Sequence, residues 1–141
     1  RIPLQEKWGI IISKDNALST KQYVKKEDLK ELPLFLTNRE IIQSEISNWL
    51  KGDVSLHSMF SYNFASAILP FIQDNKGAAI TVEGAYQVLN QKNISFIPFY
   101  PELSTNTVFI WKKYTRLSPV ISKFIKKVQE YLEENRSLYE K

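Results

Sequence analysis

Cysteine is absent from this chain, histidine occurs only once, and no long uninterrupted apolar run is present. Without cysteine there are no disulfides, thiol nucleophiles or cysteine-based zinc sites, and the chain fits a reducing, cytoplasmic location. A single histidine, His57, is too few for most histidine-rich metal sites. Because no run of about eighteen apolar residues occurs, we expect no membrane-spanning helix. The chain also lacks an initiator methionine and a signal-peptide pattern, so we expect a piece of a longer protein.

The residues that are present have an ordinary globular composition. Of 141 residues, 43% are hydrophobic and 24% are charged, which excludes disorder and fits one domain. The net charge of +4 is small and the lysines are dispersed, so charge alone does not predict a nucleic-acid surface. The basic run 112–116 is more typical of solvent-facing residues than of a DNA-binding stripe.

Enzymatic motifs are missing as well. We find no glycine-rich phosphate loop, no nucleophile elbow and no zinc-binding pair of histidines on a helix. Adjacent carboxylates, such as Glu27 with Asp28, lie on polar stretches, which favours solvated side chains over a catalytic pair. His57 is expected at a surface or partly packed position. The sequence therefore predicts no enzyme, no cofactor and no metal site.

Short apolar runs alternate with amphipathic segments along the chain. Strands are expected over 8–12, 32–37, 53–62, 77–82, 93–100 and 105–114. Helices are expected over 38–52, 63–75, 83–92 and 118–135, with one or two helical turns inside 23–32 and a turn over 14–21. Strands separated by helices of about ten residues imply crossover connections and a mainly parallel sheet.

Several residues predict where these helices begin, bend or end. Thr37 or Asn38 is expected to cap the first long helix, and Gly52 to end it. Pro70 must bend or split the second helix. Ser118 followed by Pro119 is typical of a helix start.

Polar residues follow three of the expected strands. In an α/β sheet, ligands bind at the carboxyl ends of the strands, where the helix N-termini favour an anion. The structural alternative is that the asparagines are helix caps and the threonine at position 81 is an ordinary strand residue. The candidate binding residues are Thr37, Asn38, Arg39, Ser61, Tyr62, Asn63 and Thr81.

The ordered segments 6–19, 23–39, 75–81 and 109–128 together resemble the effector-binding domain of LysR-type transcriptional regulators. The turn that follows the first strand in that family is represented here by residues 14–18, with Ala17 where proline is common. The family's Gly-x-Gly loop corresponds to 75–77, where Asn75 tolerates a left-handed backbone nearly as well as glycine. A Trp-Lys-Lys strand and a Ser-Pro-started helix match 111–124. The resemblance covers roughly residues 6–135.

The resemblance implies an α/β, periplasmic-binding-protein-like (type 2) fold: a mainly parallel sheet flanked by helices, as part of a two-subdomain effector-binding domain. Residues 14–105 would form the second subdomain, 6–13 and 106–113 the hinge-crossing strands, and 118–135 the C-terminal helix of the first subdomain. The effector would lie in the cleft between subdomains, and the seven candidate residues would supply one wall. The opposite wall would lie outside this sequence. The apolar face of the last helix would then be exposed or covered by another chain.

We therefore expect a sensor of a small, anionic metabolite. The resemblance implies a homodimer or higher oligomer, DNA contact only through a domain outside this chain, and no membrane partner. The alternative is a two-lobed solute-binding protein of a transport system, which an export signal before residue 1 would favour. A small α/β enzyme is a third possibility, although no nucleophile and base pair supports it.

Overall fold

The computed structural model describes residues 5–51, 56, 58–108, 110, 112 and 116–135. The chain divides into two compact units, one formed by Lys7–Ser104 and the other by Arg1–Glu6 together with Thr105–Lys141. The first unit contains nearly all of the sheet, and it carries every one of the candidate binding residues. The second unit contains the helix α4 (Pro119–Glu134).

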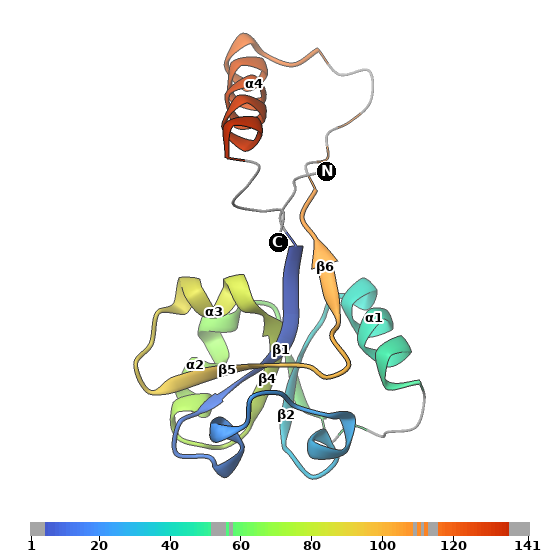
Figure 1. Cartoon of the computed structure of the whole chain (residues 1–141), viewed down its shortest axis with the longest axis vertical. Coiled ribbons are helices and arrows are strands. Elements are labelled where there is room, and N and C mark those ends of the chain that lie inside the picture. Colours follow the sequence, from blue (N-terminus) through green and yellow to red (C-terminus); the bar gives the residue numbers. More distant parts are fainter. Residues whose placement is uncertain are drawn as a thin grey trace. The chain divides into compact units, whose positions relative to one another are not determined.

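A sheet of six strands organises the structure (Figure 1), and its main path has the order β3-β2-β4-β1-β5. The strand β6, off this path, pairs with β1. The strands are β1 (Gln5–Ser13), β2 (Leu34–Thr37), β3 (Ser58–Tyr62), β4 (Ala78–Val82), β5 (Ile94–Pro98) and β6 (Ser104–Asn106).

The sheet is mixed, so the expectation of a mainly parallel sheet holds for only part of it. The strand β2 pairs in parallel with both β3 and β4. The strand β1, in contrast, is antiparallel to both of its neighbours on the main path, β4 and β5. Since β4 and β5 both run opposite to β1, they point the same way, and the carboxyl ends of β2, β3, β4 and β5 lie at one end of the sheet.

Helices cover both faces of this sheet. Figure 1 shows α1 (Glu40–Leu50) on one side and α2 (Ala65–Gln73) and α3 (Glu83–Leu89) on the other. Alternate strand residues supply two apolar clusters: Ile10 and Leu34 belong to the cluster that includes α1, whereas Ile11 and Phe35 belong to the one that includes α2. The continuous apolar runs in the sequence are thus explained by strands that are buried on both faces.

The short connections between these elements differ in part from the expected ones. Within 23–32 the expected helical turn is a 3₁₀ helix, η2 (Lys26–Leu29), and within the expected turn 14–21 lies a second one, η1 (Ala17–Thr20). Asn16 begins η1 by accepting a hydrogen bond from the Leu18 backbone N–H at 3.0 Å. Asn75 adopts the predicted left-handed backbone, with φ of 54°, and its side chain accepts a bond from Asn16.

Helix ends were predicted less well than helix positions. The helix α1 starts at Glu40 with Arg39 as its N-cap, so neither Thr37 nor Asn38 caps it. At its other end Lys51 takes the left-handed conformation that closes α1, while Gly52 lies outside the described residues. Pro70 does not split α2, which continues from Ala65 to Gln73 around it.

The last two predicted elements also differ. The strand β6 ends at Asn106, and Val108, Ile110 and Lys112 lie outside any strand, so the expected strand 105–114 is much shorter among the described residues. The helix α4 begins as predicted, with the Ser118 hydroxyl accepting a bond from the Ile121 backbone N–H. None of the residues of α4 is buried.

Candidate functional site

The carboxyl ends of β2, β3 and β4 bring the predicted binding residues together. In the sheet, Thr37 on β2 is paired with Tyr62 on β3. Phe35 on β2 is paired with Ala79 on β4. Thr37 and Thr81 each follow this second pair by two residues, so they lie at the same level of the sheet. The three side chains of Thr37, Tyr62 and Thr81 are largely buried, with exposed fractions of 7%, 9% and 7%. These strand ends therefore form a shared, closely packed surface in the first compact unit.

Two asparagines join the loops that leave β2 and β3. The Asn38 backbone N–H donates to the Tyr62 backbone carbonyl at 3.0 Å, and the Asn38 side-chain amide donates to the side-chain oxygen Oδ1 of Asn63 at 3.4 Å. Both side chains are exposed, so each keeps polar atoms available to solvent. The structural alternative, in which these asparagines cap helices, is not observed.

Tyr62 ties the end of β3 to β4, across β2. Its hydroxyl donates to the Ile80 carbonyl at 2.9 Å. Burial raises the pKa of Tyr62 above its usual value, since burial penalises the phenolate, while a hydrogen bond from Thr81 and the charge of Arg39 act in the lowering direction. Tyr62 is therefore a neutral structural donor at physiological pH, and the Arg39 guanidinium lies close enough to act on it electrostatically.

The helices α1 and α2 both begin at this end of the sheet without a side-chain cap. Arg39 precedes α1 and Phe64 precedes α2, and neither makes a capping bond through its side chain. The Thr37 hydroxyl accepts only a long bond, 3.4 Å, from the Arg39 backbone N–H. Uncapped helix starts carry partial positive charge and unpaired N–H donors. The arrangement can hold an anion between two helix starts, with Arg39 beside it.

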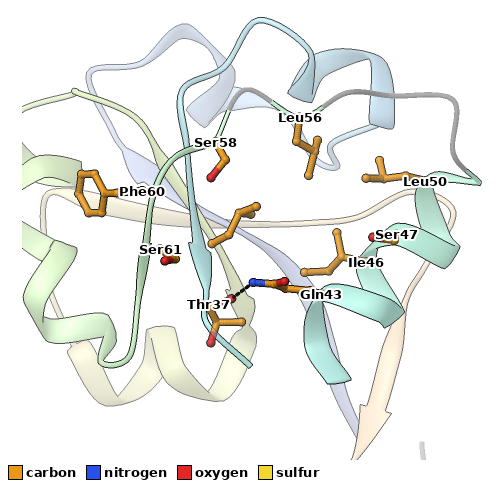
Figure 2. Close-up of a pocket in the computed structure, with 10 residues that line it drawn as sticks. Thr37, Gln43, Ile46, Ser47, Leu50, Leu56, Ser58, Phe60 and Ser61 are labelled. Carbon is orange, nitrogen blue, oxygen red and sulfur yellow. Dashed lines mark hydrogen bonds between the residues drawn. The ribbon is translucent and has the colours of Figure 1, made fainter. Parts of the chain in front are cut away.

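A pocket of about 570 Å³ extends from this surface along α1 and β3 (Figure 2). Thr37 and Ser61 line it, whereas the other five predicted binding residues do not. Gln43 lines it as well, and its side-chain amide donates to the Thr37 backbone carbonyl at 2.8 Å. The described lining residues are Leu36, Thr37, Gln43, Ile46, Ser47, Leu50, Leu56, Ser58, Phe60 and Ser61.

Most of the pocket was not predicted from the sequence. The sequence places Gln43 and Ser47 on the polar face of α1, where they are indistinguishable from solvent-facing residues. Figure 2 shows the Phe60 ring directed away from the pocket centre, and it packs on Phe35 and Phe71 with ring centroids at 4.6 and 5.4 Å. The only signal for the pocket in the sequence was the polar pair Thr37 and Ser61 at adjacent strand ends.

Other candidate chemistry lies elsewhere or outside the described residues. His57 and most of the basic run 112–116 are among the residues that the structure does not describe. Within the described part, no group of three or more acidic, histidine or cysteine side chains is placed to hold a metal ion. The helices of that part are too short or too polar to cross a membrane.

The fold is an α/β domain with a mixed sheet flanked by helices, and polar candidate residues gather at the carboxyl ends of three of its strands. The sequence matches the LysR substrate binding domain over residues 3–133, and the chain therefore belongs to that family. Domains of this family bind effectors and are not enzymes. The family match favours a regulator over the transport receptor that the sequence left open. No curated protein has a significantly similar sequence.

Solved structures of LysR-type regulators have the same fold. The regulator HinK from Pseudomonas aeruginosa matches with a TM-score of 0.72 at 13% identity, covering 92% of this chain and 45% of HinK. The regulatory domain of CcmR from Synechocystis PCC6803, in complex with 2-PG, matches with a TM-score of 0.69 at 10% identity, covering 94% of this chain and 65% of that one. The effector-binding domain of QuiR, in complex with shikimate, matches with a TM-score of 0.68 at 10% identity over 93% of this chain and 63% of QuiR. The chain thus spans a little under half of HinK and a little under two thirds of each of the two isolated domains.

Proposed function

We propose that this domain senses a small anionic metabolite and that the anion binds between the starts of α1 and α2. The observation that carries this proposal is that α1 and α2 both begin without side-chain caps after the adjacent strands β2 and β3, in loops that the Asn38–Asn63 hydrogen bond joins. Backbone N–H groups at such helix starts bind carboxylates and phosphates. Arg39 adds a full positive charge beside them.

The remaining predicted residues have supporting roles in this proposal. Thr37, Tyr62 and Thr81 hold the strand ends in register, whereas Asn38, Arg39, Ser61 and Asn63 are exposed and can contact a ligand. The structural relatives CcmR and QuiR are described with 2-PG and shikimate, and both ligands are small molecules. A small polar effector is therefore consistent with the surface on this chain.

The proposal extends to the protein that would carry this domain. Residues 14–105 would act as one subdomain, 6–13 and 106–113 as hinge-crossing strands, and 118–135 as a helix of the other subdomain. Effector binding would favour one relative orientation of the subdomains and pass that preference to a DNA-binding domain outside this chain. Such a protein would act in the cytoplasm as a dimer or higher oligomer.

Calorimetric titration of the intact protein that carries this domain tests the anion site. With inorganic phosphate and succinate as probes, Arg39→Ala should weaken binding by about tenfold or more, because a charge-assisted hydrogen bond is lost. Thr37→Ala should also weaken binding by loosening the loop before α1. Lys76→Ala is the matched control, since Lys76 is an exposed cation just before β4, at the opposite end of that strand from Thr81. Equal affinities for the Arg39→Ala variant and the unaltered protein would refute the site.

A further inference from the structure

The pocket between α1 and β3 has an apolar part that lies farther from the helix starts than the proposed anion site. Its apolar lining includes Leu36 on β2 and Leu56. Figure 2 shows Ile46 and Leu50 projecting into it from α1. Its volume of about 570 Å³ is within the range of small-molecule sites, about 300–1,000 Å³. The pocket is therefore large enough to hold more than the anionic group of a ligand.

In the pocket, the lining residues that the structure describes favour an uncharged ligand part over a second charge. None of its described lining residues is acidic or basic, and its polar groups are hydroxyls and one side-chain amide. A charge that leaves water for contact with the apolar part of this lining, without an opposite charge, is disfavoured. An apolar chain, in contrast, gains from contact with the leucine and isoleucine walls.

The pocket adjoins the proposed anion site, which consists of Asn38, Arg39, Ser61 and Asn63, through two lining residues. Thr37 and Ser61 line the pocket, and they directly precede Asn38 and Tyr62 at the strand ends. From Ser61 the pocket follows β3 back to Ser58, a span of roughly 10 Å at the usual rise per residue in a strand. One extended molecule can thus place a charged end at the helix starts and its remaining part in the pocket.

We infer that the pocket between α1 and β3 takes the uncharged, apolar part of the effector, so that the effector is an amphipathic carboxylate. This inference rests on the proposed anion site and adds the class of ligand that fits it. Thr37, Ser61 and Gln43 would mark the boundary between the polar and apolar ends. A small acid with several charges would fill the anion site and leave the pocket without a ligand.

A series of straight-chain carboxylates tests the inference on the intact protein. Acetate, butanoate, hexanoate and octanoate are titrated by calorimetry, with 1-octanol as the uncharged probe. Affinity should rise about fourfold with each added methylene, since each one buries apolar surface. Octanoate should bind more tightly than 1-octanol, because only octanoate has an anionic end.

Variants that fill the pocket test where the carboxylate chain binds. The chain-length effect is the rise in affinity with each added methylene. Ser58→Trp should remove the rise in affinity, whereas Met59→Trp should retain it, because Met59 is the next residue on β3 and does not line the pocket. Ser47→Trp and Ser44→Trp form the same kind of pair on α1. All four serine and methionine positions are exposed, and thermal melting followed by circular dichroism checks that each variant is folded.

The outcomes separate this inference from the proposed function. Equal affinities for acetate and octanoate, with binding still weakened by Arg39→Ala, would overturn the inference and leave the anion site in place. A chain-length effect that survives both Ser58→Trp and Ser47→Trp would also overturn it. A chain-length effect lost in these variants, together with no effect of Arg39→Ala on any carboxylate, would support the pocket and refute the anion site.

Discussion

Replacing Tyr62 by phenylalanine tests how the candidate site is held together. The substitution removes only the hydroxyl that donates to the Ile80 carbonyl at 2.9 Å. A buried hydrogen bond contributes about 1 kcal/mol, and a carbonyl left without its donor adds to the loss, so the free energy of unfolding should fall by about 1–2 kcal/mol. For a chain of 141 residues that loss lowers the Tm by roughly 3–10 °C. Chemical and thermal denaturation at pH 7 measure both quantities.

The pH dependence of the free energy of unfolding is a second, independent test of Tyr62→Phe. Burial raises the pKa of Tyr62 in the folded chain above the value in the unfolded chain, where it is near 10.0. The stabilisation from the neutral hydroxyl is thus complete below pH 10. It is lost as the pH rises through the higher pKa that Tyr62 has in the folded chain. The stability difference between the unaltered chain and Tyr62→Phe should therefore shrink above pH 10. Tyr23→Phe is the control, since the Tyr23 side chain is 44% exposed and should lose less than about 0.5 kcal/mol. Unchanged stability of Tyr62→Phe at pH 7 would refute the reasoning.

Three further predictions concern other parts of the chain. Gly9→Ala should destabilise the sheet by about 1–3 kcal/mol in urea denaturation, because the added Cβ would overlap the Ile97 carbonyl oxygen on β5; a neutral effect would contradict the close approach. Although partial burial opposes it, hydrogen bonds from Lys21 and the Lys25 backbone lower the pKa of Asp28. Asp28→Asn should thus reduce stability at pH 7 but have progressively less effect as the pH falls through that lowered pKa, and a loss that is the same at pH 2 would argue against it. Phe124→Ser should lower the binding of an apolar dye to the chain, since Phe124 is 55% exposed on α4; unaltered dye fluorescence would show that this face is not the dye site.

The buried strands were predictable because their sequences are apolar on both faces. Trp8–Ile12 and Ala78–Thr81 are continuous apolar or β-branched runs, and each lies inside β1 or β4. The direction of each strand relative to its neighbours was not predictable, since parallel and antiparallel buried strands can have the same apolar sequence pattern. The edge strand β3 was harder to delimit, because Ser58 to Ser61 are all exposed and give no alternating burial pattern.

The candidate site was predictable in position but not in detail. Thr37 and Asn63 follow strand signals, so their place at the carboxyl ends of β2 and β3 could be inferred from the sequence. Their hydrogen bonds could not, because the sequence favoured caps for helices that in fact start without them. Gln43 turns from the polar face of α1 toward the Thr37 carbonyl, and only the three-dimensional structure reveals that contact.

The central position of β1 has a consequence for how the chain is made. Of the strands in this sheet, β1 is synthesised first, yet Ile11 pairs with Ala79 and Phe96, which are synthesised much later. At ordinary rates of translation the segment waits roughly several seconds without a partner. A run of isoleucines in that state is prone to associate with copies of itself on neighbouring nascent chains. Rapid shielding by a chaperone, until β4 and β5 have emerged, should therefore raise the yield of folded protein.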